Sequence, residues 1–504
     1  MKIIDLFNNN QLIQPQKTAI ISGEIRLTYE HMITVIETLS RHLKSTGCRP
    51  GVKVAIVLAN SIEYLVSFFA ISAADGIILP LTAHMTTYEV AMYIQKSEAS
   101  IVITNKIYTK QLIPKLDKHS AISVFCVRYD VKNGLEVETF LAGDCKADDQ
   151  NGDVALMVPT SGTTGYPKIA MLTDSQLISN MMVYRSLMGF DGPNIVYCAL
   201  SFNHIYSICA QILTHTSLAD TFVINDKPFF IKDFLKTVQN HAITISAFVP
   251  SMAILLSEYT KPDEFDLKSL KYITLSGAKT PSSTYKRLIN QYDWVSFINT
   301  YGMTEAGSRI SIASPFPNCA PIDSVGKPMP GVSVRIVDGE RNILPTESIG
   351  EIEVKSSGIM KGYYKQRLLT SQIIVDGWLK TGDIGRVDEN GNLFLVGRKK
   401  DVIISGGENI YPLEIEEHLL EHPAILEAVV VGQEDKLLQE VPVAYIVKKN
   451  PSEKLTSFDI IKFCKSKLSS YKIPRSVRFL EKLPRLSTSK LDRSALKEIV
   501  VSSF

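Results

Sequence analysis

The sequence predicts an α/β protein with a large N-terminal domain and a small C-terminal domain. Its 504 residues exceed what a single hydrophobic core usually organises, so at least two domains are expected. Up to residue 275, short apolar runs alternate with segments of helical character, which is typical of layered α/β sheets. The pattern then changes near residue 325 and again near residue 399. These changes indicate a separate subdomain and a separate C-terminal domain.

The N-terminal elements follow one another in a regular order. A strand is expected at residues 52–58, a helix at 61–74 and a strand at 77–79. Further buried strands are expected at residues 100–104, 155–158, 243–248 and 272–275, and another apolar run begins at Ile169. In parallel sheets of this kind, ligands bind where loops leave the carboxyl ends of the strands.

The later part of the chain divides into two smaller units. Between residues 325 and 383, frequent Gly and Pro and short strands at 332–337 and 350–354 indicate a small β-barrel-like subdomain. Beyond it, a strand at 402–404, a helix at 414–420 and a strand at 428–431 indicate a small α+β domain. We therefore predict domains at residues 1–398 and 399–504, joined by the polar connector Lys399-Lys400-Asp401.

Composition excludes several classes of protein. A net charge of +2 gives no reason to expect binding to nucleic acid or to an anionic membrane. The seven cysteines are scattered and never form a C-x-x-C pair, which argues against disulfides and zinc and fits a reducing compartment. The N-terminus lacks a signal-peptide pattern, and the longest apolar stretch is too short for a transmembrane segment. We expect a cytoplasmic monomer or homodimer.

One segment points to a polyanionic ligand. Residues 160–168 read T-S-G-T-T-G-Y-P-K and lie between two apolar runs. A loop rich in glycine and hydroxyl groups at the end of a strand directs several N–H and O–H donors to one point, and Lys168 adds a positive charge. The spacing differs from that of the common NTPase loop. Taken alone, the segment could equally be a solvated turn.

Four further signatures follow in order. They are Y-G-M-T-E at residues 301–305, G-W-L-K-T-G-D at 377–383, G-R-K-K-D at 397–401, and Lys490. Together with residues 160–168 they resemble the adenylate-forming superfamily of AMP-dependent synthetases and ligases, which includes acyl-CoA synthetases, 4-coumarate–CoA ligases, luciferases and adenylation domains. The resemblance covers essentially the whole chain. It implies ATP, Mg²⁺ and coenzyme A as cofactors, or a carrier-protein phosphopantetheine in place of coenzyme A, and a mobile C-terminal domain.

The resemblance assigns the nucleotide-binding residues. Tyr301 is expected to stack on adenine, and Asp383 to accept both ribose hydroxyls, because a carboxylate is well suited to accept two donors. Without the other motifs, Tyr301 would more simply be a buried structural tyrosine, and Asp383 a residue of a turn. The full expected ATP set is Thr160, Ser161, Gly162, Thr163, Thr164, Gly165, Lys168, Gly277, Ala278, Lys279, Asn299, Thr300, Tyr301, Gly302, Met303, Asp383 and Arg398.

The resemblance also assigns residues to the chemistry. Thr304 matches the hydroxyl at the α-phosphate, Glu305 with Thr164 the Mg²⁺ ligands, and Lys490 the cation that bridges the attacking carboxylate and the α-phosphate. Lys400 matches the interdomain hinge, and Gly406 and Gly407 the tunnel for the thiol. Two departures from the family pattern are Ser489, where glycine is usual, and Ile169-Ala170 after the phosphate loop.

The acid is expected to be hydrophobic. Residues 201–206 read S-F-N-H-I-Y and contain no carboxylate. Members of the superfamily that activate amino acids use a carboxylate here to bind the substrate ammonium. An unpaired ammonium in this pocket would be costly, so we do not expect an α-amino acid as substrate. The resemblance places Phe202, Asn203, Val249 and Met252 in the acid pocket and His204 beside the chemistry, although His204 could instead be a satisfied core histidine.

The predicted function is ATP-dependent activation of a fatty or aryl carboxylic acid. The acid becomes an acyl-adenylate with release of pyrophosphate, and its transfer to coenzyme A then gives acyl-CoA and AMP, as in fatty acid metabolism. One alternative is an acyl-adenylate ligase that loads a carrier protein. Another, of a different class, is a non-catalytic nucleotide-binding paralogue.

Overall fold

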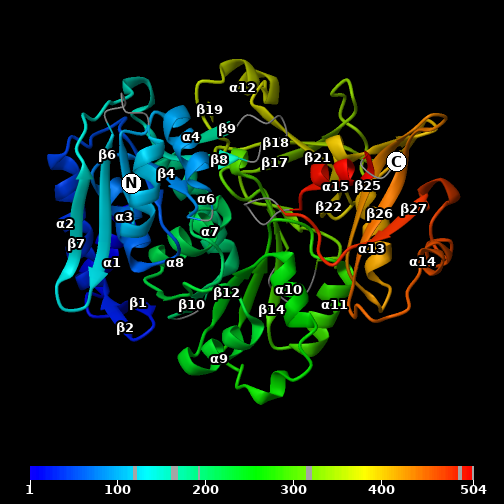
Figure 1. Ribbon diagram of the computed structural model, residues 1–504, viewed down its shortest axis with the longest axis horizontal. Helices are drawn as coiled ribbons and strands as arrows, with labels where there is room; N and C mark the ends of the chain where they lie inside the picture. Colours follow the sequence, from blue (N-terminus) through cyan, green and yellow to red (C-terminus); the bar gives the residue numbers. More distant parts are fainter. Residues whose placement is uncertain are drawn as a thin grey trace.

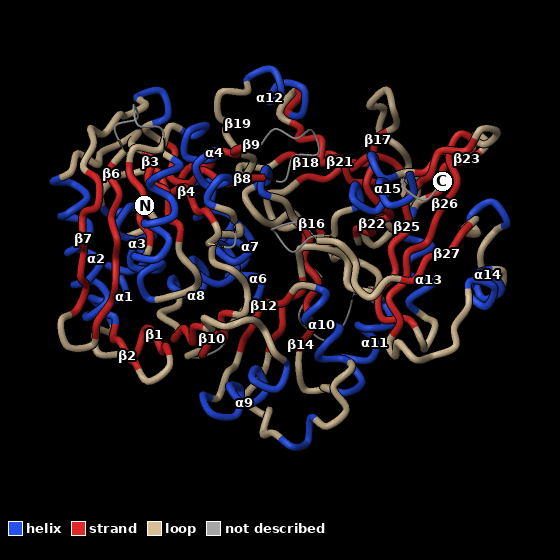
Figure 2. The backbone as a smooth tube through the Cα atoms, viewed as in Figure 1, coloured by secondary structure: helices blue, strands red, loops and turns tan. Residues whose placement is uncertain are grey.

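A computed structural model describes residues 1–83, 85–116, 122–160, 168–190, 193–313, 320–485 and 491–501. Their strands form four sheets of nine, eight, five and five strands (Figure 1, Figure 2). The two larger sheets and their helices make up the N-terminal part, and the C-terminal elements lie together on the right of Figure 1. In the described part of the chain, every helix is too short or too polar to span a bilayer.

The eight-stranded sheet has a parallel centre and antiparallel edges. Its order is β19 (Gly362–Tyr363), β9 (Lys168–Thr173), β8 (Val154–Thr160), β4 (Ile77–Leu81), β3 (Lys53–Val57), β5 (Ile101–Thr104), β6 (Ser123–Asp130) and β7 (Gly134–Leu141). Every residue of β3, β4 and β5 is buried, as expected of strands that are covered on both faces. Helices α3 (Ile62–Ala73), α4 (Thr87–Ser97) and α5 (Lys106–Leu112) connect them, each with a side-chain N-cap.

The nine-stranded sheet carries the site described below. Its order is β16 (Lys327–Pro328), β15 (Ser311–Ile312), β14 (Ser296–Tyr301), β13 (Tyr272–Leu275), β12 (Ile245–Phe248), β10 (Ile195–Cys198), β11 (Thr221–Ile224), β1 (Thr18–Ser22) and β2 (Ile25–Thr28). From β14 to β1 all neighbouring strands are parallel. The carboxyl ends of these strands therefore meet at one edge of the sheet.

Helices cover both faces of the nine-stranded sheet. They are α1 (Asp5–Ile13), α2 (Tyr29–Ser45), α6 (Asp174–Met188), α9 (Ile231–His241), α10 (Pro250–Ser257) and α11 (Ser282–Gln291). A broken helix consists of α7 (Ile205–Ser207), a π-helical turn (Ile208–Leu213) and α8 (Thr214–Ser217). One apolar cluster contains Ile20 and Phe222 of this sheet, Ile56 of the eight-stranded sheet, and residues of α2 and α3. The two sheets therefore share a core.

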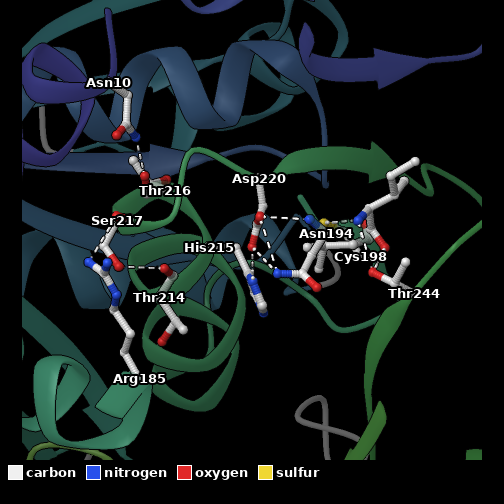
Figure 3. Close-up of polar contacts among 12 residues, drawn as sticks. Asn10, Arg185, Asn194, Cys198, Thr214, His215, Thr216, Ser217, Asp220 and Thr244 are labelled. Atoms are coloured by element: carbon white, nitrogen blue, oxygen red, sulfur yellow. Dashed lines mark hydrogen bonds and ion pairs between the residues drawn. The ribbon is translucent and has the colours of Figure 1, made fainter. Parts of the chain in front are cut away.

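A buried polar network fixes the end of the broken helix (Figure 3). Asp220 is completely buried and accepts hydrogen bonds from His215 Nδ1 at 2.8 Å and from the backbone N–H of Asn194 at 2.9 Å. Asn10 donates to the carbonyl of Thr216, which attaches α1 to the same corner. The buried charge of this network is thus compensated, as stability requires.

The third sheet is small and antiparallel, as predicted for residues 325–383. It contains β17 (Ser333–Val337), β18 (Gly350–Lys355), β20 (Ile374–Val375), β21 (Trp378–Val387) and β22 (Leu393–Arg398), with α12 (Arg367–Ile373) beside it. Glu353 is completely buried and is held by Arg335 and Arg341, at 2.6 and 2.8 Å.

The C-terminal sheet contains β23 (Ile403–Ser405), β24 (Glu408–Ile410), β25 (Ile425–Asp435), β26 (Gln439–Lys448) and β27 (Ser476–Phe479). With α13 (Pro412–Leu420), α14 (Ser457–Cys464) and α15 (Arg493–Val501) it encloses its own apolar core. It follows a 3-10 turn at Lys399–Asp401, where we predicted the connector. The domain boundary itself stays a prediction.

The predicted elements are present with small shifts of their ends. The largest difference is at residues 428–431, which form only the middle of β25. The polar C-terminal end of β25, residues 433–435, pairs with β26 in a long hairpin, and hydrophobicity alone does not mark such pairing.

Candidate active site

The carboxyl ends of four neighbouring parallel strands, and the loops that follow them, carry many of the predicted site residues. β10 leads to residues 201–206, β12 to Val249, β13 to Gly277, and β14 ends at Tyr301. A Cβ added to Gly277 would lie 3.4 Å from Cγ1 of Val249, so two of these loops are in direct contact. The fold therefore gathers residues that are far apart in sequence at one edge.

Tyr301, Asp383 and Arg398 form a hydrogen-bonded chain at this edge. The hydroxyl of Tyr301 donates to Oδ2 of Asp383 at 2.6 Å, and Nε of Arg398 lies 2.8 Å from Oδ1. Burial, reinforced by Asp383, holds the pKa of Tyr301 well above its ordinary value, so the phenol remains a donor. Asp383 raises the pKa of Arg398. A carboxylate has about four acceptor positions, so it can accept from more than one donor, and the binding of both ribose hydroxyls by Asp383 stays a prediction.

A second chain joins Glu305 to the end of the phosphate loop. Glu305 lies in a 3-10 turn (Thr304–Ala306) and is only 8% exposed, in contrast to a solvated surface glutamate. The Tyr363 hydroxyl donates to its Oε1 at 2.7 Å, and Lys168 Nζ lies 5.6 Å from the centroid of the Tyr363 ring. Burial, reinforced by Glu305, raises the pKa of Tyr363. The structure thus connects Lys168 to Glu305 through a residue that the sequence did not indicate.

Glu305 is a suitable partial ligand for Mg²⁺. Its carboxylate is a hard oxygen donor, and the described residues contain no cluster of three or more His, Cys, Asp or Glu side chains that would hold a metal without other ligands. Mg²⁺ commonly uses one or two carboxylates together with substrate phosphates, which fits this arrangement. Thr164, its predicted companion, lies outside the described residues.

Four residues of the predicted ATP set line one small pocket: Ala278, Lys279, Asn299 and Thr300. Gly277 and Tyr301 are not among the residues that line it. Lys279 Nζ lies 2.6 Å from Glu417 Oε1 on α13, so the C-terminal domain reaches this pocket. Burial raises the pKa of Glu417, and Lys279 opposes that effect. A further contact joins Ser283 of α11 to the carbonyl of Leu420, consistent with the position of α13 beside α11 in Figure 1.

The turn after β14 depends on Gly302. A Cβ at this position would lie 1.7 Å from the carbonyl oxygen of Ser308, a distance that no substitution could tolerate without moving the backbone. This close approach folds the loop back on itself and presents Met303, Thr304 and Glu305 in sequence. Steric exclusion of a side chain therefore explains why the second residue of the Y-G-M-T-E motif is glycine.

Packing accounts for part of the predicted acid pocket. Phe202 is completely buried, with its ring 5.4 Å from that of Tyr64, and Asn203 accepts a hydrogen bond from Ser201 at 2.6 Å. His204 is partly exposed and immediately precedes α7, and Met252 is partly exposed on α10. These contacts explain Phe202 and Asn203 as core residues, so their role in acid binding stays a prediction.

Several predicted residues lie outside the described part of the chain: Ser161, Gly162, Thr163, Thr164, Gly165, Ser489 and Lys490. The ends of the phosphate loop are described, and Thr160 pairs with Lys168 across the antiparallel strands β8 and β9. The departure at Ile169-Ala170 has a structural explanation, because both residues are buried and lie in β9 against β19.

The hinge and tunnel residues lie in turns. Lys400 occupies the 3-10 turn between the third and C-terminal sheets, and burial lowers its pKa. Gly406 and Gly407 connect β23 to β24 with φ of 59° and 86°, a left-handed conformation that favours glycine. A tight hairpin turn is enough to explain both glycines, and the roles in domain rotation and thiol access stay predictions.

Comparison with known proteins identifies the family. The chain matches AMP-binding enzyme over residues 7–364 and AMP-binding enzyme C-terminal domain over residues 414–490. The chain belongs to the AMP-binding enzyme family. It is 31% identical to a 2-succinylbenzoate–CoA ligase of Bacillus cereus over 97% of each chain.

Solved structures of other AMP-binding enzymes share the whole fold. o-Succinylbenzoate CoA synthetase of Bacillus subtilis, in complex with the acyl-adenylate OSB-AMP, superposes with a TM-score of 0.84 at 28% identity and covers 98% of this chain and 97% of its own. ATP-bound MatB of Rhodopseudomonas palustris gives a TM-score of 0.88 at 25% identity over 99% of each chain. The α/β fold with a large N-terminal and a smaller C-terminal domain is therefore confirmed.

This AMP-binding enzyme is an AMP-forming acid–thiol ligase, as the motifs predict. ATP, Mg²⁺ and coenzyme A are the cofactors of such an enzyme, and a small carboxylic acid is its substrate. Two of these relatives are named for an aryl acid, 2-succinylbenzoate, and not for a fatty acid. Our prediction of a fatty or aryl acid is therefore broader than the names of these relatives.

Sequence reasoning missed three residues that the structure places beside this site: Tyr363, Glu417 and Arg309. Tyr363 lies in a two-residue strand, and long-range contacts bring it to Glu305: its pairing with β9 and the backbone hydrogen bond from Met360 to the carbonyl of Glu305. Glu417 reads as one of several surface glutamates of α13. Arg309 follows the Y-G-M-T-E motif and would be expected at the surface, yet it is 2% exposed. No local signal in the sequence distinguishes them.

Proposed function

We propose that this enzyme activates an aryl carboxylic acid and transfers it to coenzyme A. The observation that carries the proposal is the convergence of the Tyr301–Asp383–Arg398 chain with Glu305 at one sheet edge. That edge offers a ribose acceptor beside a magnesium ligand, as attack on the α-phosphate of ATP requires. The names of the relatives support an aryl acid such as 2-succinylbenzoate rather than a fatty acid.

In the first half-reaction, this chain mainly positions groups and stabilises charge. Asp383 and Arg398 hold the ribose, and Thr304 donates to the α-phosphate. A carboxylate oxygen of the acid forms a bond to the α-phosphorus, and the bond from that phosphorus to the bridging oxygen of pyrophosphate breaks. Mg²⁺ held by Glu305 would offset the negative charge of the phosphates. Lys490 would pair with the carboxylate and the α-phosphate at the same time.

In the second half-reaction, the thiol of coenzyme A loses its proton and forms a bond to the acyl carbon. The bond from that carbon to the AMP oxygen breaks, and AMP leaves. We propose that Lys400 is the hinge for a rotation of residues 399–504 between the two steps. That rotation would break the Lys279–Glu417 pair and the contact between Lys449 and Glu258 at 3.0 Å.

Coenzyme A is favoured over a carrier protein as the acceptor because the relatives are named as CoA ligases. We also propose a cytoplasmic location. Cys48, Cys126, Cys145, Cys198, Cys209 and Cys464 are all free thiols, as a reducing compartment allows. Subcellular fractionation of the native protein tests this, and recovery outside the cytoplasm would contradict it.

Pyrophosphate exchange with a panel of aryl and fatty acids tests the reaction. We expect exchange with an aryl acid and consumption of coenzyme A in the same assay. Exchange without coenzyme A consumption would favour carrier-protein loading, and no exchange with any acid would favour a non-catalytic paralogue. Lys490→Ala should abolish exchange yet preserve thioester formation from supplied acyl-adenylate, and equal loss of both steps in folded protein would refute its assigned role.

A further inference from the structure

Arg493 joins the start of α15 to three other elements. It is the first residue of that helix, and its Nη2 lies 2.8 Å from Oε1 and 3.0 Å from Oε2 of Glu416 on α13. Nη1 donates to the carbonyl of Val430 on β25 at 2.6 Å, and Nε lies 3.6 Å from Oδ2 of Asp401 in the 3-10 turn. Figure 1 shows α13, α15 and β25 in the same C-terminal part. One side chain therefore contacts a helix, a strand and the turn.

The partner of Arg493 on α13 is buried. Glu416 is 5% exposed and also accepts a hydrogen bond from the backbone N–H of Val430 at 2.8 Å. Burial raises the pKa of Glu416, and the charge of Arg493 opposes that effect. A planar guanidinium donates to a carboxylate and to a carbonyl in a fixed geometry, which a flexible lysine does not reproduce. The position of the Arg493 side chain is therefore well defined.

Arg493 lies close in sequence to Lys490, the predicted cation of the first half-reaction. Lys490 itself lies outside the described residues, but both ends of its segment are described. Arg485 before the segment and Leu491 after it pair in an antiparallel bridge. The contacts that hold Arg493 therefore also hold the base of the segment that carries Lys490.

The same side chain reaches the predicted hinge. Asp401 directly follows Lys400, and its contact with Arg493 attaches the end of the 3-10 turn to the C-terminal elements. On the other side of Lys400, Nζ of Lys399 lies 2.7 Å from Oε2 of Glu351 on β18 of the third sheet. The two neighbours of Lys400 are thus attached to different parts of the fold. A change of backbone dihedral angles at Lys400 would therefore move Arg493 together with the C-terminal sheet.

The next residue of α13 contacts the nucleotide part of the site. Oε1 of Glu417 lies 2.6 Å from Nζ of Lys279, which helps to line the small pocket of predicted ATP residues. Because Glu416 and Glu417 are adjacent, one turn of α13 contacts both Lys279 and Arg493. The position of the segment that carries Lys490 is therefore related to the small pocket through two consecutive glutamates.

We propose that Arg493 is a positioning residue for the first half-reaction, which sets the place of Lys490 relative to the small pocket and to the hinge. Arg493 acts through Lys490 and not by contact with the reacting groups. A misplacement of about 1 Å in a catalytic group costs about 100-fold in rate. Thioester formation from a supplied acyl-adenylate does not need the cation at the α-phosphate, so it is independent of this positioning. This inference rests on the proposed function and adds to it a residue that the motifs do not assign.

The kinetic test measures both half-reactions for the native enzyme, Arg493→Met and Asp401→Asn. Pyrophosphate exchange with an aryl acid reports the first, and thioester formation from supplied acyl-adenylate reports the second. We expect Arg493→Met to lower the kcat of pyrophosphate exchange about 100-fold, while the KM for ATP and the second half-reaction stay unchanged. Asp401→Asn removes only the charge in the turn and should show the same selective loss to a smaller extent. Lys472→Met is the matched control, because it breaks another ion pair of α13, that of Lys472 with Glu414 at 2.7 Å.

Three kinetic results would overturn the inference. They are equal losses in both half-reactions, since general loosening of the C-terminal domain acts on both; the same loss in Lys472→Met; and native pyrophosphate exchange in folded Arg493→Met. Arg493→Lys keeps the charge without the planar fork, so its kcat should lie between those of the native enzyme and Arg493→Met. If Arg493→Met does not fold, Asp401→Asn decides the question, because Arg493 then keeps its bonds to Glu416 and Val430.

Hydrogen–deuterium exchange of the backbone amides at residues 399–405 separates this inference from the proposed reaction. It should become faster in Arg493→Met and in Asp401→Asn, but not in Lys472→Met, because only the first two variants release the turn from Arg493. This result would support the inference even if no acid supports pyrophosphate exchange. Unchanged amide exchange in both variants would refute it.

Discussion

Tyr301→Phe isolates the hydrogen bond that orients Asp383. The phenylalanine ring can still stack on adenine, and only the hydroxyl that donates to Asp383 at 2.6 Å is lost. Asp383 is 5% exposed, so water cannot freely replace that donor. We expect weaker nucleotide binding, because the carboxylate is no longer held for the ribose.

The size of the effect follows from the contacts that remain. A hydrogen bond to a charged group contributes about 1.5–3 kcal/mol. Asp383 keeps its contact with Arg398 at 2.8 Å, so the lower end of this range applies. About 1.5 kcal/mol corresponds to a rise of roughly tenfold in the dissociation constant of the nucleotide.

The assay is pyrophosphate exchange at varied ATP and saturating acid, with calorimetry of AMP as a direct binding measurement. Tyr285→Phe is the matched control. Tyr285 is also a buried tyrosine, and its hydroxyl donates to the carbonyl of Phe297 at 2.6 Å. Both variants should lose stability, but only Tyr301→Phe should raise the KM for ATP.

The reasoning is refuted if Tyr301→Phe binds AMP as tightly as the native enzyme. It is also refuted if Tyr285→Phe weakens AMP binding to the same extent, because the effect would then come from general loosening of the nine-stranded sheet.

Three other substitutions test separate parts of the site and fold. Tyr363→Phe removes the donor to Glu305 and should raise the Mg²⁺ concentration for half-maximal exchange about threefold or more; an unchanged Mg²⁺ curve would exclude this role. Lys400→Pro should leave exchange intact but slow thioester formation from supplied acyl-adenylate, and an unchanged second step would remove Lys400 from the hinge. Burial alone would raise the pKa of Glu353, but Arg341 and Arg335 outweigh burial and hold that pKa below 4.5. The ionised carboxylate of Glu353 therefore stabilises the fold above pH 4.5, and this stabilisation is lost as the pH falls through the folded-state pKa. Glu353→Gln should therefore lower the free energy of unfolding by about 3 kcal/mol near pH 7 and flatten its acid dependence in denaturant titrations; native-like stability near pH 7 would contradict this.

The strands and the order of the motifs could be predicted from the sequence because both are local signals. Residues 272–275 are apolar throughout, and the structure places a strand there, β13 (Tyr272–Leu275). The contact between Tyr301 and Asp383 could not be predicted from physics alone, because the two residues are 82 positions apart and meet only when two sheets pack. The burial of Arg309 was equally hidden, since charge alone predicts exposure. Only the resemblance to a family suggested which distant residues belong together.

The site lies where three sheets meet, which explains why no single motif describes it. Tyr301 ends a strand of the nine-stranded sheet, Asp383 lies in β21 of the third sheet, and Tyr363 lies in β19 of the eight-stranded sheet. The bond from Tyr301 to Asp383 crosses from one sheet to another, and the bond from Tyr363 to Glu305 joins the eight-stranded sheet to the turn that follows β14. Both tyrosines therefore join separate parts of the fold and orient a carboxylate at the same time. The proposed ribose acceptor and the proposed magnesium ligand come together only when all three sheets are packed, so formation of the proposed nucleotide site depends on the tertiary fold of the whole N-terminal part.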